Sequence, residues 1–142
     1  MKYLQLSASD YVLKLEPDDE IVSSLKSFAQ IHGYNFYRFE GIGALKNPKL
    51  GFFDVNINKY SDKLFRSDFE ICSFSGNISR VDDNFAAHCH IVLSGNDYKT
   101  IGGHFLEGIV TVTVEINLTG FDKAVIRTKD EKSGLNLFDF GD

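Results

Sequence analysis

The chain has 142 residues, enough for one domain with a hydrophobic core, and we expect a single domain over residues 1–142. It carries 20 acidic against 15 basic residues, for a net charge of −5, which argues against a general affinity for nucleic acid or anionic lipid. No stretch approaches the roughly 20 apolar residues of a membrane span, and the N-terminus has no apolar signal core. We therefore expect a cytoplasmic protein with no membrane partner.

One segment of the chain has helical periodicity. Acidic residues at 18–20 are typical of a helix N-terminus, and Gly33 is typical of a helix end. Between them the apolar residues recur at helical spacing: Ile21, Val22, Leu25, Phe28 and Ala29. The pattern predicts one principal helix over 18–32.

The remaining segments have the alternation and turn residues of β-strands. We predict strands over 11–15, 34–42, 49–56, 69–78, 86–94, 99–104, 109–118 and 124–128. One helix followed by a run of strands indicates an α+β fold. We expect a mostly antiparallel sheet of six or more strands, flanked by the main helix and by short helices.

The strand over 109–118 has the most regular alternation in the chain. Val110, Val112, Val114 and Ile116 fall on one face and alternate with Thr and Glu. Such a pattern indicates one buried face and one polar face, so we expect these four side chains to be buried.

Three of the four histidines lie within seventeen residues, in two predicted strands joined by a tight turn. His88 and His90 share one face of their strand, because successive side chains alternate. A turn centred on Asn96 would place His104 opposite His88, and a turn centred on Asp97 would place it opposite His90. Either register brings the three imidazoles onto one face with Cβ atoms about 5 Å apart, whereas a half-residue shift would remove His104 from it.

Three imidazoles this close are able to share a divalent ion, so we predict a metal site at His88, His90 and His104. Three imidazole ligands with one open position suit Zn²⁺ and a bound water, although nothing singles out zinc over other borderline metals. Two other roles stay open: hydrogen bonding within the fold, and acid–base catalysis without a metal.

Carboxylates and thiols near the histidines are further candidates for such a site. Glu107 and Glu115 would either orient a histidine or lie solvated on the surface. Cys89 points away from both neighbouring imidazoles, so a Cys–His pair is not predicted, and we expect Cys72 and Cys89 to be reduced core thiols. No catalytic residue is identified.

Six segments, taken in order, resemble the plants-and-prokaryotes conserved (PPC) domain family in its stand-alone prokaryotic form. The strongest part of the resemblance is the combination of His-x-His with Gly-Gly-His. The segments are EGIGA (40–44), LGFFD (50–54), SGNIS (75–79), HCHIVLS (88–94), GGHFLEG (102–108) and TVEI (113–116).

The resemblance implies an antiparallel sheet flanked by helices, assembly as a homotrimer and, in some prokaryotic members, a metal at the His-x-His and Gly-Gly-His positions. In plants the domain is attached to AT-hook segments that bind DNA, but this chain contains no Arg-Gly-Arg-Pro hook. Direct DNA binding is therefore not expected. We expect apolar surface at a trimer interface, with Phe65, Phe85, Phe105 and Phe138 as candidates.

Three functions are compatible with these observations. The preferred one is a homotrimeric module that binds a metal, a small ligand or a partner protein. One alternative is a DNA-associated regulatory protein, as members of the family are named. The other is a hydrolase-type enzyme in which the three histidines hold a metal that activates water.

Overall fold

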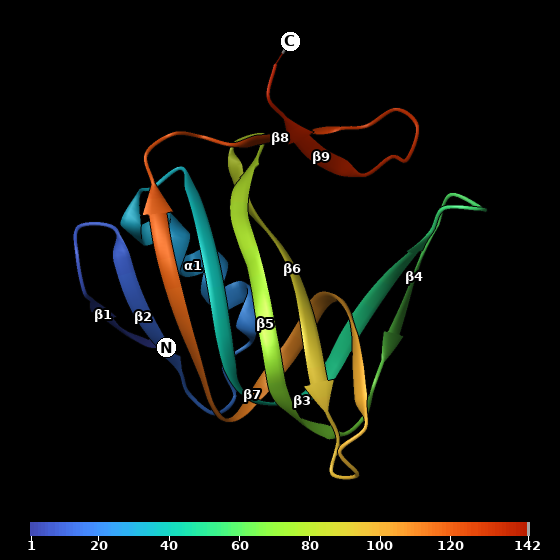
Figure 1. Cartoon of the computed structure of the whole chain (residues 1–142). Helices are drawn as coiled ribbons and strands as arrows, with labels where there is room; N and C mark the ends of the chain where they lie inside the picture. The colour runs from blue at the N-terminus through green and yellow to red at the C-terminus, as the bar shows by residue number, and fades with distance from the viewer. Residues whose placement is uncertain (142) are drawn as a thin grey trace.

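The computed structural model describes residues 1–141, which form a nine-stranded sheet and one helix, α1 (Ile21–His32) (Figure 1). The strands are β1 (Lys2–Gln5), β2 (Asp10–Leu15), β3 (Phe36–Asp54), β4 (Lys59–Leu64), β5 (Asp68–Val81), β6 (Asn84–Ser94), β7 (Thr100–Phe121), β8 (Ile126–Lys129) and β9 (Asn136–Asp139). The predicted sheet of six or more strands with one main helix is confirmed. The sheet is mixed, because β8 runs parallel to β5.

The predicted short helices were wrong for the described residues, in which α1 is the one α-helix. The connections between strands are occupied by turns and bends, which leave no room for further helical turns. Strands β1, β4 and β9 were not predicted. Their side chains are exposed throughout, so they lack the alternation of apolar and polar residues by which a strand is recognised.

Helix α1 begins at Ile21, three residues later than predicted. Asp18 has a φ of 69°, which is outside the helical region, and Glu20 caps the helix by accepting hydrogen bonds from the backbone N–H groups of Val22 and Ser23. The predicted end is confirmed, since Gly33 adopts the left-handed conformation after His32.

Strands β3, β5, β6 and β7 pair in a closed cycle. β3 pairs with both β5 and β7, and β6 also pairs with both β5 and β7. Two long strands make this possible: β3 and β7 each join two segments that were predicted separately. The backbones of these two paired strands approach each other closely at Gly43, which has a φ of 144°. A Cβ atom at this position would collide with the backbone of Thr113.

The core lies between α1 and one face of this sheet. Leu25 and Phe28 of the helix are fully buried, as are Val114 and Ile116 of β7. Phe85 and Phe105, predicted as interface residues, are instead buried in this core, whereas Phe138 is partly exposed and Phe65 packs against the core edge.

Two irregularities in strand pairing overturn predictions of burial. Val110 and Val114 are four residues apart in β7, but their partners Leu45 and Gly43 are two apart in β3. The resulting bulge turns Val112 outward, and its side chain is 70% exposed. In β5 a similar shift leaves Cys72 without a partner in β6, so Cys72 is exposed rather than a core thiol.

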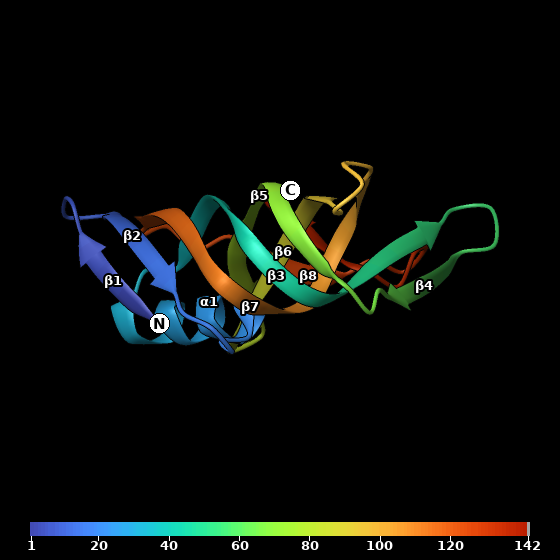
Figure 2. The same ribbon diagram turned by 90° about the horizontal axis from the view of Figure 1, so that it is seen from below.

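The helix and the two projecting hairpins lie at different parts of the sheet. Helix α1 lies beneath one half of the sheet, and the hairpin of β3 and β4 extends from the opposite end (Figure 2). The hairpin of β8 and β9 lies at one end of the sheet beside the turn between β5 and β6 (Figure 1). In residues 1–141, α1 is too short to cross a membrane.

We expect Gly43→Ala to lower the free energy of unfolding by at least about 2 kcal/mol, because its Cβ would have to displace the backbone of β7. Gly33→Ala is the matched control. It changes another glycine of positive φ, but nothing lies within 4 Å of the added Cβ, so a loss of about 1 kcal/mol is expected. Urea denaturation followed by circular dichroism measures both. Equal losses would show that the close approach of β3 and β7 at Gly43 does not constrain the fold.

Candidate metal centre

Strand pairing brings the three histidines of β6 and β7 to one place. Of the two registers left open by the sequence, the structure has His90 opposite His104, with the turn centred on Asp97. His88 lies two residues before His90 on the same face of β6. The opposite face of β6 carries Cys89, Ile91 and Leu93, which are buried.

The three imidazoles form a compact triangle. The ring centroids are 5.5 Å apart for His88–His90, 5.1 Å for His88–His104 and 5.4 Å for His90–His104. One ligand nitrogen from each ring lies within 4.8 Å of the others. His88 and His90 are exposed, and His104 is half-buried, so the cluster is open to solvent on one side.

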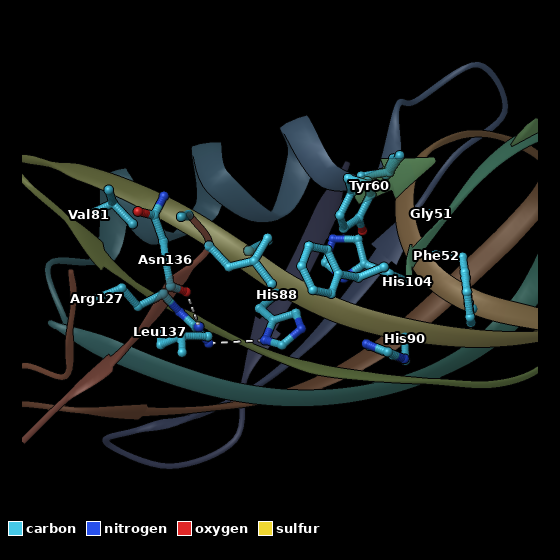
Figure 3. A pocket seen from close by; sticks show the side chains of 16 residues that line it. Gly51, Phe52, Tyr60, Val81, His88, His90, His104, Arg127, Asn136 and Leu137 are labelled. Atoms are coloured by element: carbon cyan, nitrogen blue, oxygen red, sulfur yellow. Dashed lines mark hydrogen bonds between the residues drawn. The ribbon is translucent and has the colours of Figure 1, made fainter. Parts of the chain in front are cut away.

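Arg127 of β8 lies directly beside this cluster. Its Nη2 is 3.1 Å from Nδ1 of His88, and its Nη1 donates to the backbone carbonyl of Asn136 at 2.9 Å (Figure 3). The same guanidinium donates to Ser79 Oγ at 2.8 Å and to Asn77 Oδ1 at 3.1 Å. Because a guanidinium only donates, Nδ1 of His88 is the acceptor and the neutral ring carries its proton on Nε2.

The environment keeps two of the histidines uncharged at neutral pH. Burial is the main cause that lowers the pKa of His104 to about 4, and the nearby His88, His90 and Arg127 contribute to the same shift. Burial is also the main cause of the lowered pKa of His88, with Arg127 and His90 contributing. A neutral imidazole has a free lone pair, which is the form that binds metal.

The histidines form part of the wall of a cavity of about 550 Å³. Its other walls come from the β3–β4 hairpin, with Phe52 and Tyr60, and from the β8–β9 hairpin, with Leu137 (Figure 3). The rings of Tyr60 and His104 are nearly perpendicular, with their centroids 5.9 Å apart. A cavity of this size with apolar walls and a few convergent polar groups is typical of small-ligand sites.

The donor set fits a divalent ion. Three imidazoles with a solvent-open side supply three ligands and leave a further position for water or a ligand. Metal binding would require a change at His88. His88 accepts from Arg127 through Nδ1, so a metal on Nδ1 would displace the guanidinium, and a metal on Nε2 would move the ring proton to Nδ1.

Sequence reasoning missed Arg127, and of the two positions left open for the carboxylates the structure has the surface one. Glu107 and Glu115 are exposed and do not line the cavity. Arg127 lies 23 residues beyond His104, at no diagnostic spacing, and reaches His88 because β8 pairs with the end of β5. The one available signal was its position in a predicted strand, directly after three apolar residues.

The buried thiol takes no part in the cluster. Cys89 is 1% exposed, and burial raises its pKa to about 12, so it remains a thiol at neutral pH. Its Sγ lies 3.7 Å from the carbonyl oxygen of Phe105, in the core. The predicted absence of a Cys–His pair is confirmed for Cys89.

Fold and site together define a small β-sheet domain with a cavity that contains three clustered histidines. The model of the Plants and Prokaryotes Conserved (PCC) domain family matches residues 5–122, and the chain belongs to this family. Among curated proteins, none matches the chain.

Solved structures share this fold over nearly the whole chain. A candidate DNA-binding protein from Bacteroides thetaiotaomicron is 31% identical with a TM-score of 0.93, covering 98% of this chain and 96% of that one. A metal-containing protein from Archaeoglobus fulgidus is 29% identical with a TM-score of 0.83, covering 91% of each chain. A plant- and prokaryote-conserved protein from Pyrococcus horikoshii is 28% identical with a TM-score of 0.84, covering 94% and 92%.

The lowered pKa of His104 predicts a specific pH dependence of stability. Below about pH 6.5 the unfolded chain binds a proton at this position, but the folded protein does not until about pH 4. The unfolded state binds more protons in this window, so the free energy of unfolding should fall as the pH drops from 6.5 toward 4.

Urea denaturation of the metal-free protein at pH 6.5, 5.5 and 4.5 measures this dependence. His104→Gln removes the titrating group and should show a shallower decline than the wild type. His32→Phe is the comparison outside the cavity: burial lowers the pKa of His32 as well, so this variant should flatten the decline by less than His104→Gln does. Parallel declines for the wild type and His104→Gln would contradict the assignment.

Proposed function

We propose that the protein is a metal-binding module, with His88, His90 and His104 as the ligands of a divalent ion such as Zn²⁺ and with the adjoining cavity as the site of a small ligand. The observation that carries the proposal is the placement of three imidazole nitrogens within 4.8 Å of one another on the wall of a cavity of about 550 Å³. Isolated histidines in strands are not grouped in this way.

Each residue of the site has a distinct role in this proposal. Bound Zn²⁺ would supply a Lewis acid with an open position. The half-buried setting of His104 keeps the ring neutral, so that metal does not compete with a proton near neutral pH. Phe52, Tyr60 and Leu137 surround the open side with largely apolar surface, which favours an organic ligand over bulk water.

A related protein supports the metal assignment. The Archaeoglobus fulgidus structure, at 29% identity, is described as metal-containing. Zinc is our candidate because imidazole nitrogen suits it and three histidines with one open position are a common zinc arrangement, although copper, nickel and cobalt accept the same donors.

A role at DNA is the second candidate, since the Bacteroides thetaiotaomicron relative carries that description. The distribution of charge in this chain argues against direct contact with a duplex. The chain has 20 acidic against 15 basic residues, and four of the basic ones, Lys2, Lys46, Lys49 and Lys99, are each paired with an aspartate or glutamate. Phosphate contacts require basic side chains that are free to replace counterions.

We expect the purified protein to bind close to one Zn²⁺ per chain, and His88→Ala, His90→Ala and His104→Ala each to reduce affinity at least about 100-fold, because each removes one of three ligands. Elemental analysis and calorimetric titration with zinc alone, at pH 7.5, measure this. His32→Phe and Cys89→Ala are the controls, and both should bind zinc as the wild type does.

Two results would overturn the metal assignment. One is a wild-type protein that neither contains metal nor changes its melting temperature or histidine resonances when zinc is added. The other is zinc binding that survives all three substitutions in the cluster.

We also propose that the chain assembles as a homotrimer. The β3–β4 hairpin extends away from the rest of the sheet (Figure 2). It carries exposed apolar side chains, including Phe52, Val55 and Ile57, which are 67–78% exposed. Exposed apolar groups on a projecting hairpin are typical of surfaces that pack against another chain.

Light scattering at micromolar concentration should give about three times the chain mass of 16.0 kDa. Ile57→Asp should lower the mass, because it places a charge on the proposed interface, whereas Tyr98→Asp, at the tip of a different hairpin and 89% exposed, should not. A monomer mass for the wild type would contradict the proposal.

A further inference from the structure

Arg127 is a buried cation that has no carboxylate partner among residues 1–141. Its side chain is 7% exposed, and none of the ion pairs formed within residues 1–141 involves it. Its partners are a hydroxyl, an amide oxygen, a backbone carbonyl and an imidazole, all of them uncharged. Buried charges in proteins are normally paired or bound to a ligand of opposite charge, because an isolated one is costly.

The guanidinium lines the same cavity as the histidine cluster. That cavity is bordered by three histidines and Arg127, and among the described residues that line it there is no aspartate or glutamate. The contrast with the whole chain, in which acidic residues outnumber basic ones, is pronounced. A divalent ion on the histidines would add two further positive charges, so the occupied cavity would lack compensating negative charge on its own walls.

The bonding of Arg127 leaves room for an anion. Four of its five N–H groups are used, and one on Nη1 is free. Metal bound to His88 would release a second, because the ring could no longer accept from Nη2 through Nδ1. Two N–H groups on the two Nη atoms of a guanidinium match the spacing of carboxylate oxygens, and such paired bonds are among the stronger charge-assisted ones.

The remaining walls set the character of the ligand. Val81, Ala87, Leu106 and Leu137 are apolar, and the ring of Phe138 lies 4.0 Å from the guanidinium carbon and holds it in place. A ligand with one anionic group and an apolar body would pair with the guanidinium and pack against the apolar side chains.

From this geometry we infer that the cavity binds a small organic carboxylate, whose anionic group pairs with Arg127 and whose apolar body lies against the hairpins of β3–β4 and β8–β9. This inference rests on the proposed function in locating the ligand beside the metal centre, but one N–H on Nη1 of Arg127 is free to bind an anion without the metal.

Benzoate and its neutral analogue benzamide test the inference, since they have the same shape and differ in charge. We expect zinc-loaded wild-type protein to bind benzoate at least about tenfold more tightly than benzamide in calorimetric titration at low salt. Arg127→Gln should lose at least about tenfold in benzoate affinity and leave benzamide unchanged. Arg127→Lys, which keeps the charge without the paired N–H groups, should lose less.

Arg80→Gln is the matched control. Arg80 is also bonded to a side-chain amide and lies over a phenylalanine ring, but it does not line the cavity, so benzoate affinity should not change. Circular dichroism and melting temperature establish that each variant is folded. If Arg127→Gln does not fold, the wild-type benzoate-to-benzamide ratio together with Arg127→Lys still decides the question.

Titration of metal-free protein separates this inference from the metal proposal. Weaker benzoate binding that still depends on Arg127, in a protein that binds no zinc, would support the carboxylate site and overturn the metal site. Zinc binding with equal affinities for benzoate and benzamide, or with a benzoate affinity unaffected by Arg127→Gln, would overturn the carboxylate site and leave the metal site standing.

Discussion

Pairing of β6 with β7 aligns His90 with His104, and the same two strands complete a cycle with β3 and β5 around a buried core. This closure fixes the register, since a slip of one residue would turn Ile91 and Leu93 out of the core and the histidines into it. The positions of the imidazoles are therefore secured by burial on the opposite face of the strand. The geometry of the site therefore depends on core side chains that are not part of the site.

Burial and charge act together on the cavity. Removal from water favours neutral imidazoles, and the adjacent guanidinium reinforces that preference. Arg127 itself remains a cation because arginine loses its proton only at very high pH, even though burial lowers its pKa. The cavity thus combines neutral nitrogen donors with one fixed positive charge, a combination suited to a metal and an anion but poorly suited to another organic cation.

The sequence was sufficient for the parts of the structure that local periodicity determines. The helix, the paired histidine strands and the shared face of the three imidazoles follow from spacings of two and of about 3.6 residues. The register was left open because the turn contains Tyr98 in a left-handed conformation, which tyrosine seldom adopts. Val112 and Cys72 lie at bulges, where one strand gains residues that its partner lacks. Arg127 contacts His88 only because of tertiary packing, so no local sequence pattern could predict this contact.

The two halves of the cavity come from different parts of the chain. The histidines lie within residues 5–122, which match the family model, whereas Arg127 and Leu137 follow that region, on a separate hairpin. Substitutions in this hairpin would alter the charge and shape facing the cluster without changing the residues of the closed strands themselves. Such an arrangement would let the wall of the cavity change while the geometry of the three histidines stays the same.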